Sequence, residues 1–177
     1  MTDISELATF SWPTGRAPTP LPGFVVSSFS PLVAEVANRC LAARHGNPPA
    51  AEEVGRRTAL VLVTGSGDAE SAAHVARAVD TGARIGPLQF FQSVPNSVAG
   101  HIATEWGLGG PVVCLCPTGD PRADGLAQAQ LLIDDGDADE VLVVLVEQAG
   151  VEQAGVERAG TGEESAEAVL VSKGESR

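Results

Sequence analysis

The sequence has few of the residues that hold metals or form disulfides. Three cysteines occur, an odd number, and two of them form a C-x-C pair inside an apolar run, which is typical of reduced, buried thiols. The three histidines are scattered and join no cysteine at zinc-ligand spacing. We therefore expect neither a metal site nor a cofactor. The residues concerned are Cys40, Cys114, Cys116, His45, His74 and His101.

Long apolar runs and basic residues are also scarce. No run reaches the roughly 18 apolar residues that a membrane span needs. The N-terminal sequence MTDISELATF lacks the basic start and apolar core of a secretion signal, so we expect a cytoplasmic protein without a membrane partner. The 23 Asp and Glu outnumber the 11 Lys and Arg, and the formal charge of -12 repels phosphate backbones. Nucleic acid is therefore not an expected partner.

The sequence does contain enough apolar residues for one globular domain, because 44% of its 177 residues are hydrophobic. Prolines cluster near the N-terminus, which predicts an extended, Pro-rich segment over residues 1–22 with little regular structure. The domain itself is expected to cover residues 23–177.

Apolar runs and helical spacings predict the elements of this domain. Strands and helices follow one another in turn, which predicts a layered α/β fold. The branched run at 58–63 is continuously apolar, as in a central strand covered on both faces. The predicted strands are 24–29, 58–63, 112–116, 140–146 and 166–172, and the predicted helices are 32–43, 69–79, 97–106 and 123–134.

Residues 146–160 repeat a five-residue unit as VEQAG, VEQAG and VERAG. A period of five matches neither the 3.6-residue period of a helix nor the two-residue period of a strand. We therefore expect a duplicated, solvent-exposed insertion in the domain.

Three segments carry a family pattern: SVPNSVAGHIATEWGLGGP at 93–111, LLIDDGDADEVLVVLVE at 131–147 and AEAVLVS at 166–172. Together with the preceding RTALVLVTGSG they resemble the N-terminal half of a β-ketoacyl synthase, the thiolase-fold condensing enzyme of fatty acid and polyketide assembly. The resemblance covers roughly residues 24–172. It implies a thiolase-like half-domain, in which a five-stranded mixed sheet carries helices on its faces.

The resemblance also locates a missing nucleophile. Family members carry their catalytic cysteine nine positions beyond the glycine of the Gly-Pro pair, and here that position is Gly119. The two catalytic histidines of the family lie in its C-terminal half, which this sequence does not reach. Thioester transfer needs a nucleophile and enolate stabilisation needs those donors. The resemblance therefore implies a chain without condensing activity of its own.

Weaker catalytic candidates remain beside Gly119. Cys114 and Cys116 alternate along the predicted strand and share one face, where apolar surroundings raise the pKa of a thiol. Buried packing thiols are therefore favoured over a displaced nucleophile such as Cys116. His101 lies on a predicted helix among apolar neighbours and is favoured as a core or interface histidine. Asp120 is the remaining candidate base.

The strand at 112–116 is apolar and has no charge or proline to protect an edge, so we expect a partner to cover it. In condensing enzymes of the family, the matching strand pairs with its copy across a two-fold axis. Chain length factors and ketosynthase-like subunits of type II polyketide and aryl polyene systems lack the cysteine, bind a catalytic ketosynthase and set product length sterically. The resemblance thus implies such a heterodimer, with any acyl carrier protein docking mainly on the other subunit.

The residues implied at the acyl tunnel or interface lie on one predicted helix, on an aromatic pair and on the edge strand. Two of the helical residues, Ala72 and Val75, are equally compatible with an ordinary amphipathic core face. The full set is Ser71, Ala72, Val75, Phe90, Phe91, Val112, Val113, Cys114, Leu115 and Cys116.

Two other functions stay open on the sequence alone. A homodimeric enzyme could use a vestigial acyl pocket to isomerise, dehydrate or cyclise a carrier-bound polyketide, with His101 or Asp120 as its base. A homodimer could also serve only as an acyl-binding scaffold. Genes for a ketosynthase and a carrier protein beside this one would favour the heterodimer.

Overall fold

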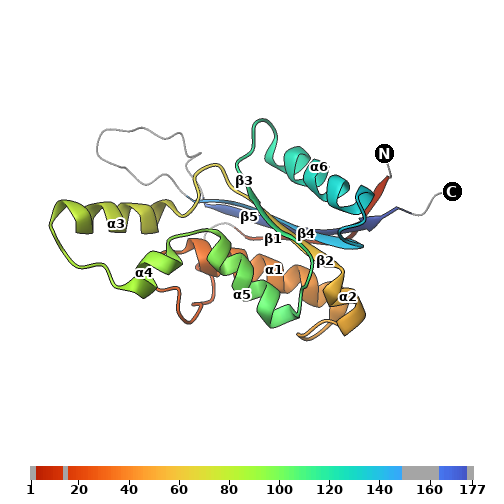
Figure 1. Ribbon diagram of the computed structural model, residues 1–177, viewed down its shortest axis with the longest axis horizontal. Helices are drawn as coiled ribbons and strands as arrows, with labels where there is room; N and C mark the ends of the chain where they lie inside the picture. The colour runs from red at the N-terminus through yellow and green to blue at the C-terminus, as the bar shows by residue number, and fades with distance from the viewer. Residues whose placement is uncertain (1–2, 14–15, 149–163, 175–177) are drawn as a thin grey trace.

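A five-stranded sheet forms the centre of the computed structural model, which describes residues 3–13, 16–148 and 164–174. The strand order is β1-β5-β4-β2-β3, with β2 parallel to β3 and β4, and β5 antiparallel to β4 and β1 (Figure 1). The predicted five-stranded mixed sheet is confirmed. The strands are β1 (Ile4–Ser11), β2 (Thr58–Val63), β3 (Val112–Leu115), β4 (Glu140–Glu147) and β5 (Ser165–Lys173).

Helices cover both faces of the sheet. In Figure 1, α1 and α5 lie on one face and α6 lies on the other, while α3 extends away from the sheet. None of the described helices is long and apolar enough to cross a membrane. The helices are α1 (Phe29–His45), α2 (Glu52–Arg56), α3 (Ala69–Asp80), α4 (Pro87–Gln92), α5 (Asn96–Trp106) and α6 (Pro121–Asp134).

The alternation of side chains along β2 divides the core into two layers. Leu60 and Leu62 pack with α1 and α5, whereas Val61 and Val63 pack with α6. Every residue of β2 is buried, so the prediction of a central strand covered on both faces is confirmed. Trp106 is the largest buried side chain of the α5 layer, and its indole N–H donates to Asn38 Oδ1 at 2.8 Å.

The N-terminal region differs from the prediction. The expected unstructured segment contains β1, which pairs with β5 and has a bulge between Glu6 and Ala8. The bulge breaks the two-residue alternation by which a strand is read from sequence. The strand expected at 24–29 is absent: Phe24 forms only an isolated bridge with Leu21, and Phe29 already begins α1.

Cys40 lies in the buried face of α1, and burial raises the pKa of its thiol from 9.0 to about 11. Between these values only the unfolded chain loses the proton, so stability is fully present below pH 9 and falls as the pH rises towards 11. We expect the free energy of unfolding to drop by up to about 2 kcal/mol over this range. Urea unfolding at stepped pH measures it, and the chain has no tyrosine to titrate in the same window. The Cys40→Ala variant should show a shallower decline, and an identical decline would contradict the assignment.

Candidate functional site

The loop between β3 and α6 contains Gly119, where the family pattern places the nucleophile. Gly119 is exposed, and a Cβ atom built on it would meet nothing within 4 Å. The loop therefore has room for a cysteine side chain, and what it lacks is the thiol itself. Pro121 occupies the first position of α6, where its missing N–H leaves no helical bond unmade.

Two carboxylates of this chain bind the backbone amides of the same loop. Asp124 Oδ2 accepts from the N–H of Thr118 at 2.7 Å and of Gly119 at 3.1 Å, and these bonds hold the pKa of the carboxyl below its usual range. Asp120 caps α6 by accepting from Ala123 N at 2.7 Å. Backbone amides are common donors to an oxyanion in acyl transfer. At Gly119 the loop thus offers no nucleophile, and the amide of that residue is already bound by Asp124.

Strand β3 lies at the edge of the sheet, and its outer edge is unpaired in the described chain. Val113 and Leu115 are half-buried beside the α6 layer, whereas Val112 is 43% exposed. Cys114 and Cys116 are exposed, so the expectation of buried packing thiols is wrong for the free chain. The apolar run had suggested a buried strand, but the residues of β3 alternate between exposed and half-buried.

The predicted tunnel residues of α3 differ in burial. Ser71 is buried, and its N–H donates to the helix-capping Asp68 Oδ1 at 3.0 Å. Ala72 is exposed and Val75 is half-buried, so an ordinary core role does not fit Ala72. Phe90 and Phe91 on α4 are 63% and 58% exposed, the most open of the large aromatic rings described.

The candidate bases His101 and Asp120 are not brought together. His101 lies on α5, with its ring edge-on to Phe24 at a centroid distance of 5.9 Å and its Nε2 3.8 Å from Glu105 Oε2. Asp120 begins α6 on the opposite face of the sheet, and its carboxylate already caps that helix. Cys116 Sγ lies 3.9 Å from the carbonyl oxygens of Gly65 and of Pro117, neither of which is a base.

The first three residues of the repeat, Val146 to Gln148, belong to the fold, which the sequence did not indicate. Glu147 ends β4, and its carboxylate accepts from Gly65 N and from Ser66 Oγ, the latter at 3.0 Å. Gln148 is 3% exposed and donates to Ser28 Oγ at 3.1 Å. The expectation of a solvent-exposed insertion is therefore wrong for these first residues. The other copies lie outside the described residues.

A cavity of about 310 Å³ lies beside the first turn of α6, at the carboxyl end of β4. Trp12 and Pro121 line it together with the carboxylates Glu147 and Glu167. Neither carboxylate is free: Arg122 pairs with Glu167, and Ser66 Oγ donates to Glu147 at 3.0 Å. Among the described residues, no group of three or more His, Cys, Asp or Glu side chains is placed to hold a metal ion.

Comparison with known proteins gives the family. A family model described as the β-ketoacyl synthase, N-terminal domain matches residues 26–176. The chain is similar to the structure of the ketosynthase (ApeO) in complex with its chain length factor (ApeC) from Xenorhabdus doucetiae, with 24% identity, a TM-score of 0.69, and coverage of 92% of this chain and 65% of that chain. None of the curated proteins matches the sequence.

Two further solved structures are similar. The ishigamide ketosynthase/chain length factor gives 21% identity and a TM-score of 0.71, with 89% of this chain and 47% of that chain covered. A β-ketoacyl synthase from Burkholderia phymatum STM815 gives 15% identity and a TM-score of 0.66, with 89% and 48% covered. The chain thus spans between 47% and 65% of the length of these three structures.

At such identities the structural likeness shows the thiolase-like ketosynthase fold, which agrees with the predicted half-domain. The family model covers nearly the whole chain. The chain therefore belongs to the β-ketoacyl synthase family and contains its N-terminal domain.

Proposed function

We propose that the chain is a non-catalytic ketosynthase-like subunit of a type II polyketide or polyene system, which pairs with a catalytic ketosynthase and shapes its acyl tunnel. The observation that carries the proposal is the loop after β3. Gly119 presents no nucleophile there, and Asp124 already holds the amide of that residue. A chain built in this way contributes surface and shape to a complex and leaves the bond-forming chemistry to its partner.

The edge strand β3 supports pairing with another chain. Its exposed residues Val112 and Cys114 are apolar or weakly polar, and an unprotected apolar edge invites strand addition. Two of the similar structures are named as a ketosynthase with a chain length factor. Two copies of a chain with a formal charge of -12 repel each other, which favours a different, less acidic partner over a homodimer.

The tunnel role rests on small or exposed side chains of α3 and α4. Ala72 and Val75 on α3 leave room for an acyl chain, and Phe90 and Phe91 on α4 are open to contact by a partner. An acidic acyl carrier protein would dock on the ketosynthase, because this chain repels it. The length of the acyl chain would then be set by steric fit at the interface.

Thiol labelling tests the pairing. In the free chain, exposed Cys114 and Cys116 should react with iodoacetamide, at a rate that the raised pKa of the partly desolvated Cys114 thiol lowers at that site, while buried Cys40 reacts only after unfolding. A saturating ketosynthase from the same gene cluster should slow labelling of Cys114 at least tenfold, because pairing at β3 covers it. Mass spectrometry of timed samples measures the labelled fraction of each cysteine. Cys40, which stays unlabelled in the folded chain, is the internal control for unfolding. Unchanged labelling of Cys114, together with separate elution of the two proteins in size-exclusion chromatography, would rule the proposal out.

A further inference from the structure

An open groove of about 700 Å³ runs along the outer side of α5. Phe24 and His101, in edge-on contact with each other, line it together with Phe91 and Val94. Ser97 Oγ donates to Phe91 O at 2.6 Å, which fixes the end of α4 against the first turn of α5. The groove is therefore lined by segments that contacts within the chain hold in place.

Gly100 lies in the middle of α5 and lines this groove. A glycine inside a helix lowers helix stability relative to alanine. Packing within this chain gives no reason for it, since a Cβ atom on Gly100 would meet nothing within 4 Å. On α6, by contrast, a Cβ on Gly125 would lie 2.7 Å from Val143 Cγ1. The missing side chain at Gly100 thus leaves the helix backbone open to close approach from outside the chain.

The rim of the groove continues into exposed apolar side chains. On α4, Leu88 and Phe90 are each 63% exposed, and Val94 at the rim is 39% exposed. Several exposed large apolar side chains on and beside one short helix are typical of a site of protein contact. A small free ligand in the groove would leave Leu88 and Phe90 in water, whereas a protein surface covers them together.

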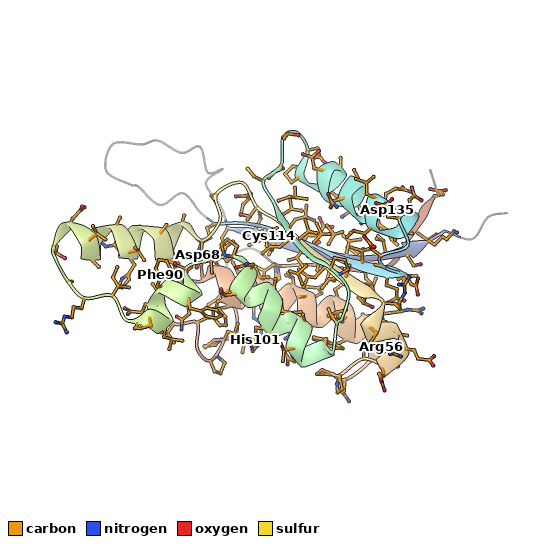
Figure 2. The ribbon with its side chains drawn as sticks, viewed as in Figure 1. Arg56, Asp68, Phe90, His101, Cys114 and Asp135 are labelled. Atoms are coloured by element: carbon orange, nitrogen blue, oxygen red, sulfur yellow. The ribbon has the colours of Figure 1, made fainter. Side chains whose placement is uncertain are left out.

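The groove lies on the same side of the molecule as the open face of β3. The parallel register places Val112 beside Leu60 and Cys114 beside Leu62. Val112 and Cys114 therefore lie on the face of the sheet that α5 covers at β2. Helix α5 contacts β3 on one side and α4 on the other. In Figure 2, His101 lies below Cys114, and Phe90 lies to the left of both on α4. A chain paired with β3 therefore reaches the groove across α5.

We propose that this groove receives a bulky apolar side chain of the ketosynthase that pairs with β3, seated against the bare backbone of Gly100. The inference rests on the proposed function and adds to it an anchoring site away from the strand. Large side chains that enter well-packed pockets are the contacts that dominate binding energy at protein interfaces. The charge of -12 argues against a second copy of this chain as the occupant.

The Gly100→Leu variant tests the site by filling the groove from its floor. Its thermal midpoint should not fall, because the Cβ atom meets open space and leucine favours a helix. The Kd for the ketosynthase, measured by isothermal titration calorimetry, should rise at least tenfold. The matched control is Ala127→Leu, which adds the same side chain to an exposed position of α6 on the other face and should leave the Kd unchanged.

The readouts separate this inference from the proposed function. At saturating ketosynthase, Cys114 should still be protected from iodoacetamide in Gly100→Leu, because strand pairing persists. Equal Kd values for wild type and Gly100→Leu would overturn the groove assignment and leave the proposed function standing. Absence of any binding by the wild type would overturn both. Self-association of the wild type that Gly100→Leu abolishes would identify a second copy as the occupant and overturn the assignment to the ketosynthase.

Discussion

Replacement of Cys114 by proline is expected to weaken binding of the ketosynthase at least a hundredfold, while the chain itself stays folded. In the sheet, Leu60 N donates to Pro111 O at 2.9 Å and Thr64 N donates to Leu115 O at 3.1 Å. Successive residues of a strand direct their amides to opposite sides, so the N–H of Cys114 faces the free edge. Proline removes this donor and places its ring there, without breaking a bond to β2.

The expected loss corresponds to about 2.7 kcal/mol of binding free energy. Isothermal titration calorimetry measures it, and circular dichroism with a thermal midpoint within a few degrees of wild type shows that the sheet is intact. Cys114→Ser is the matched control: it keeps the N–H and is expected to bind within threefold of wild type. If Cys114→Pro bound as tightly as Cys114→Ser, the partner would not pair along β3, and the central contact of the proposed complex would be wrong.

The sequence was sufficient for the parts of the fold whose burial is complete. The run at 58–63 is apolar and branched at nearly every position, and it is the central strand with both faces covered. The helical spacing at 97–106 marks α5 to within one residue of its start. In these places the pattern of apolar residues along the chain agrees with the residues that the fold buries.

The sequence was insufficient where the pattern depends on something outside the segment. The bulge in β1 interrupts its alternation, so Ile4–Ser11 did not read as a strand before the Pro-rich stretch. Phe24 to Phe29 are apolar at both ends, but this segment crosses the face of α5 and does not join the sheet. Strand β3 is an edge strand as predicted, but its cysteines were expected to be buried, because an edge that another chain covers has the composition of a core strand.

The candidate site shows the same division. The position of Gly119 followed from the family resemblance and its nine-residue spacing, and the structure places it on the loop between β3 and α6. The amide contacts of Asp124 were missed, although an Asp in the first turn of a helix after a glycine loop is a recognisable signal for such bonds. The contacts of Glu147 and Gln148 were not predicted, because both residues belong to the repeat that was interpreted as an exposed insertion. They lie instead at the end of a buried strand.

Replacement of Gly110 by alanine is expected to lower the free energy of unfolding by at least about 3 kcal/mol. Gly110 lies just before β3, and its N–H donates to Thr58 O at 3.1 Å. A Cβ atom there would lie 2.6 Å from Thr58 O and 2.8 Å from Ala59 N. Both atoms are backbone at the start of the fully buried β2, which cannot move aside without disturbing its pairing with β4. Urea unfolding followed by circular dichroism measures the loss.

The contrast with Gly119 gives this prediction its control. Gly119→Ala adds the same methyl group nine residues further along, where it meets nothing within 4 Å, and should change stability by less than about 0.5 kcal/mol. The two glycines bracket the strand on which pairing depends: one is fixed by the close approach of β3 to β2, and the other is free to vary. If Gly110→Ala were as stable as Gly119→Ala, the tight entry into β3 would not set the position of the edge, and the loop beyond it would have to be positioned by α6 alone.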